Sequence, residues 1–492
     1  MGIVQRDSFR ITIVSYLGAA IGYLNKIFLF TNFLTTEQVG LANLLITISV
    51  LYAQVAAMGS YNIILRFFPF FKDPDKAHHG FLPGMVIFSL AGFAMASMVF
   101  LLLLSPFKAL YQTSAPLLTA YALYIIPLAL ATMVYQIFEA YLRSLQKNLV
   151  PSLTYDLGLR LFVTLAILLF ATGLIDFRHF VIFYVIANCL PALIVVLYTH
   201  LIRQLFLKPA HTKLIRRMGT IIVVYGLYSL LNNLSIMLLS SIDSLMVAGM
   251  IDLGAAGIYT TMIFVTSVML IPYRNMIKVS APLVASYWKT KAMHEMQALY
   301  RKATATNLVI GAGIFLLIWV NLDAIFSLIP GDYEAGRTVL LLLSIGKLFD
   351  MAAGLNGTIL LTSKRYRYDL FFTIGLVVVA ILSNLLLIPL LGMNGAALAS
   401  MLTMVLFNLL RVLFIRHHFS LQPFAWKDLL VPMIVGLIII ASSLIRQAPH
   451  VLVDIPLRSG LAALLYIIPV YLLAISPNIN RLIDQYKKMI LK

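Results

Sequence analysis

The sequence is poor in cysteine and in charged residues. Its 492 residues include a single cysteine, Cys189, so no disulfide bond can form within the chain. Charged residues make up 11% of the chain, where soluble domains have about a quarter. The apolar set reaches 61%, which excludes intrinsic disorder and leaves too little polar surface for a water-soluble enzyme. We therefore expect an integral membrane protein that needs no disulfide framework.

Acidic residues are the scarcer of the two charge types. The chain has 18 Asp and Glu against 36 Lys and Arg, a formal net charge of +18. In a soluble protein this excess would suggest a nucleic-acid partner. In a membrane protein, basic residues mark the connectors that stay in the cytoplasm, so topology explains the excess first. We expect no nucleic-acid partner.

Long apolar runs dominate the rest of the chain. A spanning helix needs about 20 mostly apolar residues. Fourteen ranges meet this requirement, with twelve as the alternative count: 11–34, 41–65, 81–104, 118–139, 152–174, 179–200, 218–241, 254–277, 303–322, 337–361, 368–390, 394–415, 428–445 and 460–476. The predicted fold class is therefore an all-α polytopic membrane protein. No connector exceeds about 25 residues, which leaves no room for a soluble catalytic domain.

The distribution of basic residues predicts the sidedness of these spans. With the N-terminus in the cytoplasm, and with residues near the span ends counted with the adjoining loop (Arg274, Arg411 and Arg337), cytoplasmic segments hold 28 of the 36 basic residues and outer loops hold five. One missing span would invert every later loop and remove this asymmetry. We therefore predict an even number of spans, with the N- and C-termini both in the cytoplasm.

Two short segments suggest an internal repeat. Thr35–Ala42 follows the first span and Leu253–Thr260 follows the seventh, and each has a glycine that opens the next helix. The glycines, Gly40 and Gly257, are 217 residues apart, which is about six spans. Six is an even number, so the two halves would share one orientation about an axis along the membrane normal. The predicted division is residues 1–215 (helices 1–6), 216–420 (helices 7–12) and 421–492 (helices 13–14 and the tail).

Three stretches resemble a known family. They are the repeated glycine segments just described, with Ser241–Asp243 before the second copy, then Ile329–Ala335, and then Asn384–Pro389 followed by Gly392–Ala399. Together they resemble the polysaccharide or O-antigen flippases of the multidrug/oligosaccharidyl-lipid/polysaccharide (MOP) flippase superfamily. Taken alone, each stretch also fits a tight hairpin between closely packed helices.

The resemblance implies a function, a location and partners. It implies a secondary transporter, not an enzyme, in the bacterial cytoplasmic (inner) membrane. The transporter would turn a lipid-pyrophosphate-linked oligosaccharide, a precursor of polysaccharide or lipopolysaccharide, from the cytoplasmic to the outer leaflet by alternating access. Family members are thought to couple to H⁺ or Na⁺, and other glycan-assembly proteins would be partners. No further cofactor is expected.

Ionisable residues inside spans are costly, by about 2.5–3.5 kcal/mol on insertion scales, so they are candidates for function. Lys26 lies about fifteen residues into the first span with no acid within one turn. It fits either an interhelical partner or a cation that lines a central cavity and neutralises pyrophosphate. The resemblance to lipid II flippases of the superfamily adds Arg66 and Arg274 as cavity cations.

Arg274 follows Pro272, where we expect a kink, and Lys278 lies one turn further on. The two cations form a basic stripe, which fits either a cavity lining or an anchor at the cytoplasmic interface.

Two pairs of opposite charges lie deep in other spans. Asp156 and Arg160 are spaced i, i+4, and Lys347 and Asp350 are spaced i, i+3, so each pair is expected to neutralise itself. Alternatively, a pair that breaks when an ion or proton binds would couple transport to a gradient. No residue spacing typical of a metal site is present.

Two other functions compete with the flippase. A multidrug or organic-cation antiporter of the same superfamily would need acidic residues in its cavity, but the first span has no Asp or Glu and the deep charges lean positive. A membrane glycan polymerase or glycosyltransferase would need paired carboxylates or a large outer loop. The outer loops offer only scattered acids.

Overall fold

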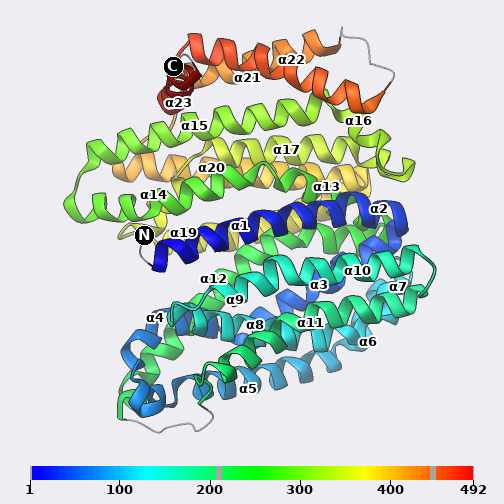
Figure 1. The fold of residues 1–492 in the computed structure, drawn as a ribbon, viewed down its shortest axis with the longest axis vertical. Helices are drawn as coiled ribbons and strands as arrows, with labels where there is room; N and C mark the ends of the chain where they lie inside the picture. Colours follow the sequence, from blue (N-terminus) through cyan, green and yellow to red (C-terminus); the bar gives the residue numbers. More distant parts are fainter. Residues whose placement is uncertain (1–2, 207–212, 444–449, 491–492) are drawn as a thin grey trace. The chain divides into compact units, whose positions relative to one another are not determined.

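The computed structural model describes residues 3–206, 213–443 and 450–490, and every regular element among them is helical (Figure 1). An apolar segment in a bilayer must satisfy its own backbone hydrogen bonds, and helices do so within one segment. Contacts divide the chain into two compact units, Met1–Thr261 and Met262–Lys492, which we call unit 1 and unit 2. Each is described by itself.

Unit 1 begins with a long helix that is interrupted by one π-helical turn. Its elements are α1 (Ile3–Tyr23), η1 (Leu24–Leu29), α2 (Phe30–Phe33), α3 (Thr36–Ala57), α4 (Ser60–Phe71), η2 (Pro74–Gly80), α5 (Phe81–Leu102), α6 (Leu104–Tyr111), α7 (Pro116–Ala120), η3 (Ala122–Tyr124), α8 (Ile125–Ser144), α9 (Leu149–Ser152), η4 (Leu153–Gly158), α10 (Leu159–Ala171), α11 (Phe177–Leu201) and α12 (Lys213–Met250). The helix α13 (Leu253–Ser267) crosses the boundary between the units.

Unit 2 contains two helices that break within a span. Its elements are α14 (Leu270–Thr290), α15 (Met293–Val320), α16 (Leu322–Ser327), η5 (Gly331–Gly336), α17 (Arg337–Ala352), α18 (Asn356–Thr362), α19 (Arg367–Leu391), α20 (Met393–Phe419), η6 (Trp426–Leu429), α21 (Leu430–Ser443), α22 (Val451–Leu472) and α23 (Pro477–Ile490). The axes of α13 and α14 differ by 51°, and those of the η5–α17 segment and α18 by 50°.

The helices confirm the predicted fold class. Within the described ranges, eleven helices are long and apolar enough to cross a membrane, and the count is thirteen if each bent pair is one span. These thirteen overlap thirteen of the fourteen predicted ranges. The remaining range, 428–445, coincides with α21 and runs into residues 444–449, which lie outside the described part. The sidedness of the termini and the three-part division at residues 215 and 420 stay predictions.

Connectors that the sequence places on the outer side meet one another in unit 1. The backbone N–H of Leu253 donates to the carbonyl oxygen of Ser114 at 3.2 Å. The hydroxyl of Tyr111 donates to the carbonyl oxygen of Leu245 at 3.3 Å. These contacts join the connector before α8 to the end of α12 and the start of α13. They are what we expect if these connectors lie on the same side of the membrane.

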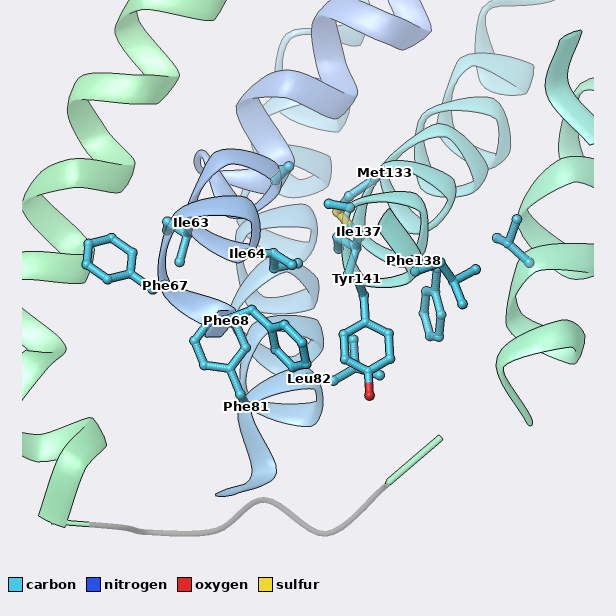
Figure 2. Packing of buried hydrophobic residues seen from close by; sticks show 14 of the residues in the cluster. Ile63, Ile64, Phe67, Phe68, Phe81, Leu82, Met133, Ile137, Phe138 and Tyr141 are labelled. Carbon is cyan, nitrogen blue, oxygen red and sulfur yellow. The ribbon is translucent and has the colours of Figure 1, made fainter. Parts of the chain in front are cut away.

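The apolar core of unit 1 lies where α4, α5 and α8 pack together (Figure 2). Phe68 of α4 contacts Tyr141 of α8, with ring centroids 5.1 Å apart, and Phe81 of α5 at 6.0 Å. Ile64 fills the same space and is fully buried. Lipid is as apolar as these side chains, so close packing is what holds such helices together.

Candidate functional site

Lys26 is held by neutral partners. It lies in η1, the π-helical turn between α1 and α2, and its side chain is half-buried. Its ammonium donates to the amide oxygen of Asn43 on α3. It also lies 4.4 Å from the ring centroid of Phe30 and 5.9 Å from that of Tyr184. None of the ion pairs between described residues includes Lys26, so its positive charge is not neutralised within the chain described.

The amide of Asn43 extends this contact to a second helix. Its Nδ2 donates to the hydroxyl of Thr260 on α13 at 2.8 Å. The Thr260 hydroxyl in turn donates to the carbonyl oxygen of Ala256 at 2.8 Å. With its nitrogen engaged in this way, Asn43 can present only its oxygen to Lys26, which fixes the orientation of the amide.

The π-helical turn is itself anchored by a buried amide. Asn25 donates to the carbonyl oxygen of Arg160 on α10 and accepts from the hydroxyl of Thr164, both at 2.9 Å. These bonds tie η1 to α10 on one side while Lys26 reaches α3 on the other. Single π-helical turns inside α-helices are frequent at functional sites.

The structure corrects the expected pairing of Asp156 with Arg160. The Arg160 guanidinium donates to the backbone carbonyl of Asp156, and the Asp156 carboxylate accepts from the hydroxyl of Ser15 at 2.6 Å. The two side chains form no ion pair. Asp156 lies in the π-helical turn η4, whose wider turn changes the i, i+4 geometry assumed for an α-helix.

Two glycines on α1 make room for Arg160, and sequence reasoning missed them. A Cβ on Gly18 would overlap the backbone carbonyl of Asp156, and a Cβ on Gly22 would lie 2.5 Å from Nε of Arg160. Gly18 and Gly22 form a G-x-x-x-G motif, which lets helices in membranes approach closely. That spacing was a usable signal in the sequence.

Arg66, Arg274 and Lys278 are exposed. Arg66 lies on α4 of unit 1, with its guanidinium 4.4 Å from the ring centroid of Tyr225. Arg274 and Lys278 lie one turn apart on α14 of unit 2, and neither forms a hydrogen bond or ion pair with another described residue. The donors of the basic stripe on α14 are therefore not taken up by other described residues. Arg66 and Lys26 are not in direct contact.

The kink expected at Pro272 is present just before it. α13 ends at Ser267 and α14 begins at Leu270, so the break falls at Val268 and Met269. A proline ring clashes with the carbonyl of the residue four positions earlier, which is Val268 here. The break and the basic stripe therefore share one short segment.

Lys347 bonds to the helix that ends at this break. Its side chain is buried on α17, and its ammonium donates to the hydroxyl of Thr266 at 2.6 Å and to the carbonyl oxygen of Ile263 at 3.1 Å. A cation at a helix C-terminus is favourable because the carbonyl groups there carry partial negative charge. The expected ion pair between Lys347 and Asp350 does not form, since the ammonium is taken up by α13.

Asp350 belongs to a polar cluster at the second break. Its Oδ1 accepts from Nδ2 of Asn408 on α20 at 3.1 Å, and the amide oxygen of Asn408 accepts from Nδ2 of Asn356 at 2.9 Å. Asp350 and Asn356 flank the break between α17 and α18, where Gly354 has a φ of +66°. Arg411, Lys347 and Arg274 lie within electrostatic range of the Asp350 carboxylate.

A buried ion pair next to this cluster was missed in the sequence. Arg411 on α20 bonds to Asp369 on α19 through both Nε and Nη2, each 2.7 Å from Oδ1. Its guanidinium also lies 3.7 Å from the ring centroid of Phe407. Both residues fall inside predicted spans, near their ends, so their position was a usable signal.

Comparison with known structures places the fold. The chain is similar to the lipid II flippase MurJ in its inward closed conformation, with a TM-score of 0.71, 13% identity, and 93% of this chain and 97% of that chain covered. It is similar to an inward-facing multidrug resistance MATE family transporter of the MOP superfamily, with a TM-score of 0.61, 15% identity, and 83% and 94% covered. A MOP superfamily transporter from Pyrococcus furiosus matches with a TM-score of 0.54, 13% identity, and 85% and 96% covered.

At this identity the likeness is one of fold. The chain has the fold of MOP superfamily transporters. No protein-family model matches the sequence. No curated protein matches it either.

Proposed function

We propose that this protein is a flippase that turns a lipid-pyrophosphate-linked oligosaccharide from the cytoplasmic to the outer leaflet by alternating access. The observation that carries the proposal is Lys26, a cation within a span whose partners are an amide and two aromatic rings. A charge kept in a membrane without a counter-ion is costly, and a substrate that supplies the missing negative charge gives a reason for it.

The chemistry of the site favours a phosphate-containing substrate. An ammonium is a compact charge with three donors, of which Asn43 takes one. The remaining donors suit pyrophosphate oxygens, and charge-assisted bonds of this kind contribute about 1.5–3 kcal/mol each. The exposed cations Arg66, Arg274 and Lys278 would add further phosphate or acidic-sugar contacts.

The broken spans of unit 2 support coupling to H⁺ or Na⁺. Coupling-ion sites in transporters are typically built at discontinuous helices, where carbonyl groups are free to coordinate. Asp350 flanks such a break and contacts Asn408, whereas Asp156 is occupied by Ser15 in a continuous span. Of the carboxylates considered, we propose Asp350 as the coupling group.

The proposed location is the bacterial cytoplasmic membrane, and the proposed partners are other glycan-assembly proteins. A multidrug antiporter of the same fold would need an open carboxylate to hold an organic cation. Among the described residues, the carboxylates of Asp156, Asp350 and Asp369 are engaged by Ser15, Asn408 and Arg411. This arrangement favours the anionic substrate.

The test is a flipping assay in vesicles. The full chain is reconstituted with a polyprenyl-pyrophosphate oligosaccharide that carries a fluorophore on its sugar, and a membrane-impermeant quencher reports which leaflet holds the sugar. Lys26→Ala and Arg274→Ala are each expected to slow flipping about tenfold or more, because each removes a charge-assisted contact. Lys289→Ala, which removes an exposed lysine at the end of α14, is the matched control and should flip at the native rate.

Two outcomes would contradict the proposal. Native flipping rates in both Lys26→Ala and Arg274→Ala would exclude the cavity cations. Export of cationic dyes, with no movement of the glycolipid, would instead favour the antiporter.

A further inference from the structure

A cavity lies in unit 1 between connectors that carry two lysines, a histidine and a glutamine. Its volume is about 330 Å³, near the lower limit of ligand pockets in proteins. Three separate connectors converge on it: the one after α4, the one between α8 and α9, and the one after α11. The lining residues are Lys72, His78, Leu145, Lys147, Ile202 and Gln204. The sequence places all three connectors on the cytoplasmic side.

An unusual backbone turn builds one wall of this cavity. Ala77, His78 and His79 have φ values of 51°, 50° and 53°, and Gly80 follows at 65°. Four consecutive left-handed residues are costly for L-amino acids other than glycine, and such strain clusters at functional sites. The turn inserts the His78 ring among aromatic side chains, where it is 1% exposed and lies 5.2 Å from the Phe68 ring.

The hydrogen bonds of His78 determine how Gln204 faces the cavity. The backbone N–H of Asp73 donates to Nδ1 of His78 at 3.1 Å, so the ring proton is on Nε2. Nε2 then donates to Oε1 of Gln204 at 2.9 Å. The amide oxygen of Gln204 is therefore used, and its NH₂ group, which has no partner among the described residues, is left as a donor at the cavity.

The two lysines of the cavity are also unpaired. Lys72 and Lys147 are exposed, and neither forms a hydrogen bond or ion pair with a described residue. The nearby carboxylate of Asp73 is taken up by Lys76 at 3.6 Å and His79 at 3.7 Å. Two cations and an amide donor thus line the cavity, and none of the described lining residues is a carboxylate.

We propose that this cavity binds a phosphate group, with Lys72 and Lys147 supplying charge and Gln204 a directed N–H donor. The proposed contacts are the same for either source of the phosphate. A phospholipid headgroup at the membrane surface and a free phosphate present the same oxygens. None of the lining residues is among the proposed cavity cations, and the site goes beyond the proposed function.

Two binding assays on the full chain in detergent distinguish the sources. Native mass spectrometry measures retention of phosphatidic acid against phosphatidylcholine. Thermal unfolding measures the rise in Tm with inorganic phosphate against chloride of equal ionic strength. Phosphatidic acid alone identifies a lipid headgroup site, and a response to inorganic phosphate shows that soluble phosphate also reaches it.

Two variants and a control test the assignment. Gln204→Glu keeps the acceptor for His78 but replaces the N–H donor with a negative oxygen, and Lys72→Gln with Lys147→Gln removes the charge. Each should weaken phosphate binding about tenfold or more. Lys76→Gln, in the same connector but paired with Asp73, should bind within twofold of native.

The lysine variant alone decides the outcome if Gln204→Glu fails to fold, because both lysines are exposed. The proposal is overturned if the native chain prefers neither phosphate probe, or if the lysine variant binds as tightly as native. Neither assay involves transport, so failure here leaves the proposed function standing.

Discussion

Gly40 and Gly257 pack against each other reciprocally within unit 1. A Cβ on Gly40 would overlap the carbonyl oxygen of Leu253, and a Cβ on Gly257 would overlap the carbonyl oxygen of Thr36. Gly40 and Gly257 are 217 residues apart, as are Thr36 and Leu253. Equivalent atoms of the two repeated segments therefore face each other, as at a local two-fold axis.

A methyl group at this contact is expected to destabilise the protein. Gly40→Ala and Gly257→Ala each push a Cβ into a backbone carbonyl, and backbone cannot move aside as a flexible side chain can. Overpacking of this kind costs about 1–3 kcal/mol. The apparent Tm of the detergent-solubilised chain, followed by size-exclusion chromatography after heating, should fall for both variants.

Gly375→Ala is the matched control for these variants. Gly375 lies within α19, and a Cβ there would meet nothing within 4 Å. Alanine is the better helix former, so the control should retain or slightly raise the Tm. An equal Tm for Gly40→Ala and Gly375→Ala would show that the two helices do not approach as closely as described.

Removing only one charge of the buried pair Asp369–Arg411 is expected to destabilise the protein. Its side chains are only 3% and 14% exposed, so Asp369→Asn leaves a guanidinium without its counter-charge. Removing one partner of a buried pair costs about 3–5 kcal/mol. The Tm should drop markedly for Asp369→Asn and recover in part when Arg411→Met is added.

The surface pair Arg337–Glu334 supplies the comparison. Its side chains are 40% and 53% exposed, and exposed pairs contribute about 0–1 kcal/mol. Glu334→Gln should leave the Tm nearly unchanged. A similar loss in Asp369→Asn and Glu334→Gln would argue against burial as the cause.

Composition and apolar run length predicted the fold class and nearly every span, because lipid imposes a length and a helical backbone on any crossing segment. The sequence also predicted the break beside Pro272. Sequence spacing failed for Asp156 with Arg160 and for Lys347 with Asp350. Those pairings assumed regular helices and partners on the same helix.

The partners of these charges come from elsewhere in the chain or from altered turns. Asn43, Thr266 and Asn408 each form a hydrogen bond with a charged residue on another helix. A local sequence pattern does not predict such contacts. The repeat offset shows the same limit. The residue 217 positions after Lys26 is Asp243, so the repeated backbone carries opposite charges at equivalent places.

Asp350→Asn is expected to uncouple transport while leaving the fold intact. Asparagine keeps an oxygen that can accept from Asn408, but it can neither ionise nor hold a cation by charge. In vesicles, flipping by the variant should no longer respond to an imposed H⁺ or Na⁺ gradient, while its Tm stays near native. Asp332→Asn, at an exposed residue of η5, is the control. A full gradient response in Asp350→Asn would exclude this residue as the coupling group.

The first turn of α11 should become less stable at acid pH. Asp176 caps this helix, and the hydrogen bonds that it accepts from the backbone N–H and the ring of His179 hold the pKa of its carboxyl below the usual range. A lowered pKa means that the carboxylate stabilises the folded helix above its ordinary pKa and loses this effect as the pH falls below about 4. Amide hydrogen exchange in the first turn should therefore speed up, after correction for intrinsic rates, between pH 6 and pH 3. Asp176→Ala should exchange fast at both pH values, and a pH-independent native rate would contradict the assignment.

The π-helical turn of the first span has a consequence for its register. Gly18 and Gly22 face Arg160, whereas Lys26 reaches Asn43, so the two ends of one helix serve different neighbours. One residue corresponds to about 100° of rotation around an α-helix. Deleting a single residue of Leu24–Leu29 would make the helix regular and turn the glycine face away from Arg160, or the lysine away from Asn43. A one-residue deletion here is therefore expected to break one of these two sets of contacts.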